Sequence, residues 1–106
     1  MTIETLEAYR GIVSEIQALE AELDALFEDP EADVMRATLA AKQERWKEAK
    51  RSIESWLDTV TDAEVRSIAR WHYIIGYNWK ETAAKVYGRG DYYIARKRIK
   101  RYFGKE

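Results

Sequence analysis

Residues Asn78–Phe103 read NWKETAAKVYGRGDYYIARKRIKRYF and contain two short helical patterns around a glycine turn. Asn78 followed by Glu81 predicts a capping box at the start of the first helix, because each side chain can bond the other residue's backbone N–H. Gly88 stands where that helix must end, since glycine adopts the left-handed C-cap conformation without a Cβ clash. Asp91 predicts the N-cap of the second helix. The turn between them is Gly88–Gly90.

The second helical pattern is strongly basic. Five bases occur within the six residues Arg96–Arg101, and no acid lies among them to form the i,i+4 ion pairs of an ordinary charged face. A solvated surface is the usual meaning of a charge run, but like charges this dense destabilise an isolated helix. A phosphate partner would relieve that cost, so the pattern favours DNA binding.

The spacing of small and apolar residues is that of a helix-turn-helix, whose second helix enters the major groove of DNA. Ala84 is the small residue, Gly88 follows four positions later, and Ile94 follows six positions after that. Ala83 and Ala84 together would allow another helix to approach closely.

Two positions depart from the usual helix-turn-helix pattern. Arg89 stands where an aliphatic residue commonly follows the turn glycine, and Lys97 stands where the second helix commonly turns an aliphatic residue inward. A turn that is one residue longer would rotate the second helix by about 100°. The residues that would then face inward are Ala95, Ile99 and Tyr102.

The segment Thr61–Phe103 resembles region 4 of sigma factors. The resemblance lies in the acidic opening Thr61–Glu64, in the aromatic-rich Trp71–Gly76, and in Asn78–Ala83. Small phage-encoded transcriptional regulators, including late-gene activators, look similar, with a helical N-terminal half joined to a region 4-like module. The resemblance therefore implies a phage or prophage transcriptional regulator that acts on DNA. RNA polymerase is a candidate partner for which the N-terminal helices would be the docking surface.

Position along the basic helix divides the candidate DNA-binding residues into two groups. Base edges are read mainly from the first two turns of a recognition helix, whereas later and flanking bases hold phosphates. The base-edge candidates are Asp91, Tyr92, Tyr93, Arg96 and Lys97. The phosphate candidates are Lys80, Arg89, Arg98, Lys100 and Arg101. One of the two tyrosines is expected to belong to the core instead, and Trp79 to pack between helices.

The first half of the chain predicts two long helices with coiled-coil spacing. The first runs from Thr2 to Glu28. Its seam residues are Tyr9, Ile12, Ile16, Leu19, Leu23 and Leu26, and Phe27 widens the seam. The seam residues predicted for the second are Met35, Leu39, Lys42, Trp46, Ala49, Ile53, Trp56 and Val60. Pro30 is predicted at its first position with Asp29 as the cap. Two such helices joined by a short turn are expected to form an antiparallel hairpin.

The charge is divided unevenly between the two halves. The 106 residues have a net charge of −1, but residues 1–65 hold seven bases and sixteen acids, while residues 66–106 hold eleven bases and three acids. The local charge of +8 in the second part is what a polyanion meets. We therefore expect an all-α protein with an acidic helical hairpin at residues 1–60, for oligomerisation or docking. A basic helix-turn-helix module is expected at residues 61–106, its first helix starting at a capping box of Thr61 with Glu64.

Nothing in the sequence indicates catalysis, a metal or a cofactor. There is no cysteine, and His72 is the one histidine, which is most often a packed or half-exposed residue on such a helix. No phosphate-binding glycine loop, nucleophile elbow or zinc-protease motif occurs. The apolar runs are far shorter than a membrane span. Glu4 and Glu7 stand where a secretion leader would be basic and then apolar, so we expect no leader. We expect a cytoplasmic DNA-binding protein that is not an enzyme.

Two other functions stay open at this point. A phage small terminase subunit also joins a helix-turn-helix to oligomerisation helices, but it would assemble into a ring. An adaptor of RNA polymerase would use the basic helix on an acidic protein and would not bind duplex DNA. The seam pattern fits an intrachain hairpin and a homodimer equally well, and a homodimer would suit palindromic DNA.

Overall fold

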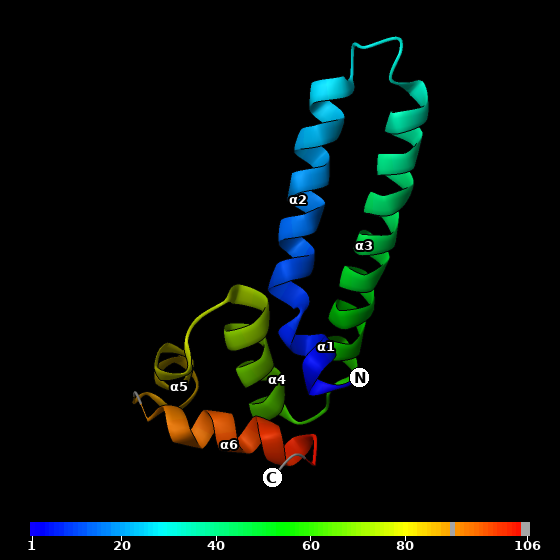
Figure 1. The fold of residues 1–106 in the computed structure, drawn as a ribbon. Helices are drawn as coiled ribbons and strands as arrows, with labels where there is room; N and C mark the ends of the chain where they lie inside the picture. Colours follow the sequence, from blue (N-terminus) through cyan, green and yellow to red (C-terminus); the bar gives the residue numbers. More distant parts are fainter. Residues whose placement is uncertain (90, 105–106) are drawn as a thin grey trace. The chain divides into compact units, whose positions relative to one another are not determined.

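In a computed structural model of the chain, residues 1–89 and 91–104 are described, and they form helices joined by turns, without a strand. Gly90 of the predicted turn lies outside the described residues. The elements are α1 (Ile3–Glu7), α2 (Tyr9–Leu26), α3 (Asp33–Thr59), α4 (Ala63–Ala69), the π-helix η1 (Arg70–Ile75), α5 (Trp79–Tyr87) and α6 (Tyr92–Tyr102), shown in Figure 1. The predicted all-α class is confirmed. No helix in the described ranges combines the length and apolarity needed to cross a membrane.

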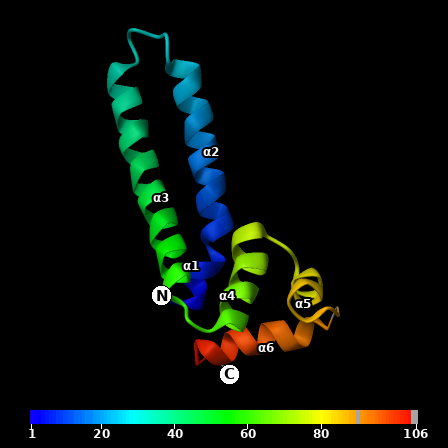
Figure 2. The same ribbon diagram turned by 180° about the vertical axis from the view of Figure 1, so that it is seen from behind.

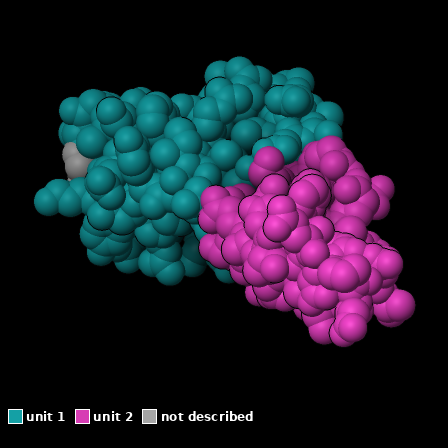
Figure 3. Space-filling model, turned by 90° about the horizontal axis from the view of Figure 1, so that it is seen from above, with its two compact units in different colours: residues 1–10, 53–106 teal, residues 11–52 magenta. Residues whose placement is uncertain are grey.

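The chain divides into two compact units, coloured separately in Figure 3. Unit 1 comprises Met1–Arg10 with Ile53–Glu106, and unit 2 comprises Gly11–Ser52. This division differs from the expected one at residues 60 and 61, because both ends of the predicted hairpin belong to unit 1. The Tyr9 hydroxyl donates a 2.7 Å hydrogen bond to Glu54, and Trp56 stacks on Phe103 with ring centroids 5.6 Å apart.

Unit 2 consists of the parts of α2 and α3 that run side by side in opposite directions (Figures 1 and 2). Gln43 donates to the Ile16 carbonyl at 3.3 Å, and Arg36 donates to the Leu26 carbonyl at 2.6 Å. The predicted seam of the first long helix faces inward, since Ile12 and Leu19 are buried and the seam residues between and after them are half-buried. Phe27, which was expected to widen it, is 77% exposed.

The predicted seam of the second long helix is out of register by one residue at its polar position. Lys42 is exposed, whereas Gln43 is buried. Met35, another predicted seam residue, is 57% exposed. The Gln43 amide is satisfied in the inward position because it donates to the Ile16 carbonyl and to the Glu20 carboxylate.

Three predicted helix boundaries differ from the structure. Pro30 lies in the turn before α3 rather than at its first position, and the Asp29 carboxylate accepts from the Glu31 N–H at 2.9 Å, which is a local Asx-type turn. The first long helix is interrupted at Ala8, which separates the short helix α1, capped by Thr2, from α2. The third difference, at the start of α4, concerns the candidate site.

In unit 1, α4, α5 and α6 pack against one another (Figures 1 and 2). Val65 and Ile68 of α4, Ala83 of α5, and Ala95 and Ile99 of α6 are fully buried. Because these buried residues come from all three helices, the helices share one apolar centre.

Candidate nucleic-acid interface

The two ends of the α5–α6 connection are fixed by the caps that the sequence predicts. Asn78 and Glu81 form the capping box of α5, with the Glu81 N–H bonded to the Asn78 side chain at 2.8 Å. Gly88 ends α5 in the left-handed conformation, with φ 76°. The Asp91 carboxylate accepts from the Tyr93 N–H at 3.2 Å and caps α6. All three capping predictions are confirmed.

The inward face of α6 includes two of the three residues expected for the longer turn. Ala95 and Ile99, four residues apart, are fully buried, while Ile94 is half-buried. Tyr102 does not complete this face, because it is 43% exposed. The α-helix ends there, and Phe103 instead turns inward to stack on Trp56.

The outward face of α6 gathers most of the predicted DNA-binding side chains. Tyr93, Arg96, Lys97 and Arg101 are exposed, and Lys100 is half-buried. Their spacing of three and four residues places them on one stripe of the helix. Tyr92, beside this stripe, is 47% exposed and Tyr93 is 60% exposed, so the expectation that one of them belongs to the core is wrong. Their rings lie 5.4 Å apart.

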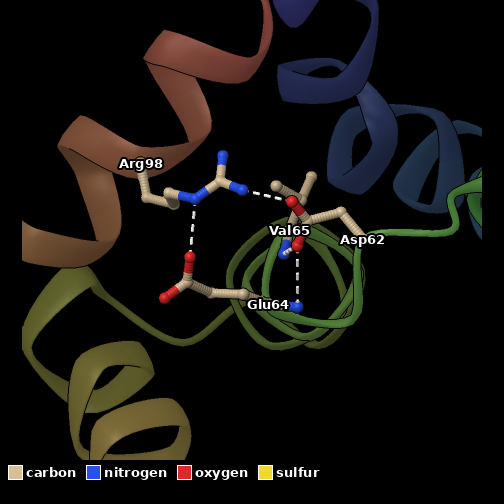
Figure 4. Close-up of polar contacts among 4 residues, drawn as sticks. All are labelled: Asp62, Glu64, Val65 and Arg98. Atoms are coloured by element: carbon tan, nitrogen blue, oxygen red, sulfur yellow. Dashed lines mark hydrogen bonds and ion pairs between the residues drawn. The ribbon is translucent and has the colours of Figure 1, made fainter.

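Arg98 differs from the other bases of α6 because two carboxylates hold it (Figure 4). Its Nε donates to Glu64 at 2.6 Å, and its Nη2 pairs with Asp62. The guanidinium thus joins α6 to the start of α4. Arg98 was predicted to hold a phosphate, but in the structure its Nε and Nη2 are engaged by carboxylates.

Asp62, and not Thr61, caps α4, which corrects the predicted capping box. Its carboxylate accepts from the N–H groups of Glu64 at 3.0 Å and Val65 at 3.1 Å. The bond from Val65 and the charge of Arg98 hold the pKa of Asp62 below its usual value. Glu64, freed from the predicted cap, is available to Arg98. The sequence carries no local signal for this pairing, because its members are more than thirty residues apart.

Further phosphate candidates lie on α5 and just after it. Lys80, in the first turn of α5, and Arg89, which follows Gly88, are both exposed. The close approach expected at both Ala83 and Ala84 involves Ala83 alone, since Ala84 is exposed.

An aromatic cluster supports the start of α5. His72 stacks on Trp79 with centroids 3.6 Å apart, and Tyr73 meets Trp79 edge-on at 5.9 Å. The packing interpretation of Trp79 is therefore confirmed. His72 Nδ1 also bonds the Tyr77 carbonyl at 2.7 Å, and burial lowers its pKa despite that bond. Burial raises the pKa of Tyr73 to about 12.

The π-helical turn of η1, Arg70–Ile75, was not predicted from the sequence. Within this wider turn, Trp71 stacks on Tyr77 at 5.4 Å, and Lys85 of α5 lies 5.3 Å from the Trp71 ring centroid. Gly76 then ends the segment in the left-handed conformation, with φ 98°. Trp71 and His72 are consecutive in sequence but stack on different residues, Tyr77 and Trp79.

Comparison of the chain with protein-family models, with curated proteins and with solved structures finds no match.

Proposed function

We propose that this protein binds duplex DNA in a sequence-specific manner and acts as a transcriptional regulator. In this proposal α4, α5 and α6 are a helix-turn-helix module with α6 as the recognition helix, and α2 with α3 is an antiparallel hairpin that serves docking or oligomerisation. One observation carries the proposal: α6 presents a basic and tyrosine-bearing stripe outward while its opposite face is buried.

The charge pattern of α6 supports a phosphate-rich partner. The α6 sequence YYIARKRIKRY contains no acid, and the two carboxylates near it at the start of α4 are engaged by Arg98. Arg96 and Lys97 therefore project from a helix whose own residues do not neutralise them. Neutralising phosphates releases counterions from DNA, which is the main source of affinity for such surfaces.

The beginning of α6 supports contact with base edges. Tyr92, Tyr93 and Arg96 occupy its first turns, where recognition helices approach bases most closely. An arginine can bond a guanine through two donors, and a tyrosine hydroxyl can donate or accept. Arg89, Lys97, Lys100 and Arg101 are assigned to phosphates, which set orientation without reading sequence. Lys80, on α5, is also assigned to phosphate contacts.

The attachment of α6 supports a rigid reading surface. Ala95 and Ile99 are fully buried, and Arg98 ties the middle of the helix to α4. Recognition side chains need a fixed backbone, because a loose helix would lose the geometry of bidentate base contacts. We remove Arg98 from the proposed phosphate contacts and assign it to this attachment.

The regulatory context rests on the resemblance to sigma region 4 and not on the geometry. In this proposal RNA polymerase is the protein partner, and the protein acts as a phage or prophage regulator in the cytoplasm.

Fluorescence anisotropy with a labelled mixed-sequence duplex tests the proposal. We expect micromolar binding at low salt, with an affinity that falls steeply as salt rises. Arg96→Ala combined with Lys97→Ala should weaken binding and reduce the slope of log K against log salt by roughly 2. The matched control is Lys47→Ala with Arg51→Ala in unit 2, which removes the same charge and should leave the slope unchanged.

No binding at low salt would refute DNA recognition and leave α6 as a protein-docking surface. Equal effects of the two double variants would show that net charge, and not the face of α6, is responsible. Once binding is established, selection from a random duplex pool would reveal whether a preferred sequence exists.

A further inference from the structure

Unit 2 has a groove on one flank of α3. Lys42, Arg45, Trp46 and Ala49 line this groove, whose volume is about 350 Å³. Their spacing of three and four residues follows one face of the helix. Met35, seven residues before Lys42, extends the same face toward the α2–α3 turn and is 57% exposed.

Among the described residues, Trp46 is the tryptophan that makes no ring-stacking contact. Trp56 stacks on Phe103, Trp71 on Tyr77 and Trp79 on His72. Trp46 is half-buried and instead lines the groove. Exposed apolar surface of this kind, with a polar rim, is typical of protein interaction sites.

The charges around the groove favour an acidic helix as its occupant. Lys42 and Arg45 are exposed at its rim. In unit 2, α2 presents the exposed acids Glu15 and Glu22, which are seven residues apart and thus on one face. The chain therefore carries both halves of a complementary pair.

The acids of α2 and the groove of α3 lie on the same side of unit 2, opposite the hydrogen bond between Gln43 and Glu20. That bond marks the other side of the α2–α3 pair. At ~100° per residue, Glu15 and Glu22 project roughly 140–160° away from Glu20 around α2. By the same rotation, Arg45 and Ala49 project away from Gln43 around α3, on the side opposite that bond.

We propose that this groove binds a second copy of the chain, with α2 of each copy seated on α3 of the other. A two-fold axis parallel to the helices places the acidic flank of each α2 over the basic groove of its partner, so one contact forms twice. Because Gln43 reaches Ile16, residues near 15 of α2 are level with residues near 45 of α3. The axis therefore brings Glu15 of the partner subunit opposite Arg45, and Glu22 of the partner subunit toward Lys42.

This dimer does not depend on DNA binding, because none of its residues lies on α5 or α6. Sedimentation equilibrium of the full-length protein tests it without DNA, from micromolar to about 100 µM, a range typical of protein association. We expect a concentration-dependent mass that approaches twice the 12.5 kDa of one chain.

Charge reversal tests the pairing itself. Lys42→Glu with Arg45→Glu, and separately Glu15→Lys with Glu22→Lys, should each raise the dissociation constant by more than about a hundredfold, because like charges would face each other. Mixing the two variants should restore a dimer, since both contacts then join opposite charges. Lys47→Glu with Arg51→Glu on α3 is the control of equal charge change, and it should dimerise like the parent protein.

A parent protein that remains monomeric at the highest concentration would overturn the proposal, and so would a larger ring. A dimer that survives both reversals would place the interface elsewhere. Failure of the mixed variants to associate, with each still helical by circular dichroism, would show that Glu15 and Glu22 are not the partners of the groove.

Discussion

Single residues in α6 with the same charge have different structural roles. Arg98 is held by Asp62 and Glu64, whereas Arg96 and Lys97 project from the outer face. We therefore expect Arg98 to contribute to stability, and Arg96 and Lys97 to contribute to ligand binding. His72 is also expected to contribute to stability, because its ring stacks on Trp79.

Replacing Arg98 should reduce stability without changing the salt dependence of DNA binding. Arg98→Met removes both ion pairs and leaves two carboxylates near the start of α4. The Arg98 side chain is 27% exposed, so solvent screening limits the expected loss to about 1–2 kcal/mol in urea unfolding. Arg96→Met is the control and should keep its stability but lose DNA affinity. The opposite pattern would return Arg98 to the phosphate contacts.

The stability of the protein should fall between neutral and mildly acidic pH because of His72. Burial lowers its pKa below the ordinary 6.5, so in this window the unfolded chain binds more protons than the native chain. The contribution is fully present above pH 6.5 and is lost as pH falls through the native pKa.

The chain has one histidine, so His72→Phe should flatten the dependence of Tm on pH between 8 and 5 while keeping the ring stacked on Trp79. A variant with the slope of the parent protein would assign that slope to other groups. The comparison uses the difference between the two profiles, because contributions from all other groups are common to both.

At the scale of the element, helix ends and helix faces depend on different kinds of information. The caps of α5 and α6 follow from adjacent residues, whereas the face that α3 turns toward α2 depends on its partner. Two sets of substitutions test these statements.

The register of α3 predicts unequal effects at neighbouring positions. Gln43→Ala removes a buried side chain with two hydrogen bonds and should cost about 1–2 kcal/mol. Lys42→Ala changes an exposed position and should alter the free energy of unfolding by less than about 0.5 kcal/mol. Urea unfolding at low protein concentration measures both. A larger loss at Lys42 would favour the register expected from the sequence.

Two glycines should respond to alanine with opposite signs. Gly88 has φ 76°, so Gly88→Ala should cost about 1 kcal/mol although no neighbouring atom would clash with the added methyl group. Gly11 lies within α2 with open space around its Cα, so Gly11→Ala should stabilise the protein by about 0.5 kcal/mol. Stabilisation by both substitutions would contradict the left-handed C-cap of α5.

At the scale of the whole molecule, the buried core is distributed unevenly between the two units. Ile12, Leu19 and Ala32 are the buried apolar residues described in unit 2, whereas unit 1 holds the rest of the fully buried core. Local stability follows the density of buried apolar contacts.

Hydrogen exchange should therefore be faster in residues 11–52 than in α4 and the middle of α6. Mass spectrometry of the exchanging protein at a few micromolar measures this difference on the typical timescale of local opening. Raising the protein concentration should slow exchange in unit 2, because the proposed dimer covers α3. Uniform protection of both units would contradict the uneven core.

The sequence by itself determined the helical class, the caps of α5 and α6, and the inward seam of α2. These features depend on interactions within a few residues or on a helical period, and both can be read from adjacent positions. The basic stripe of α6 was also evident, because charge accumulates along the chain itself.

Only the tertiary structure decided which base of α6 is held by carboxylates, which face α6 buries, and which polar residue α3 buries. The Arg98 contacts join residues more than thirty positions apart. The inward polar residue of α3 is Gln43 and not Lys42, because Gln43 bonds the Ile16 carbonyl and Glu20. Several registers satisfy a local pattern almost equally well. The partner surface selects among them because buried polar groups need hydrogen bonds.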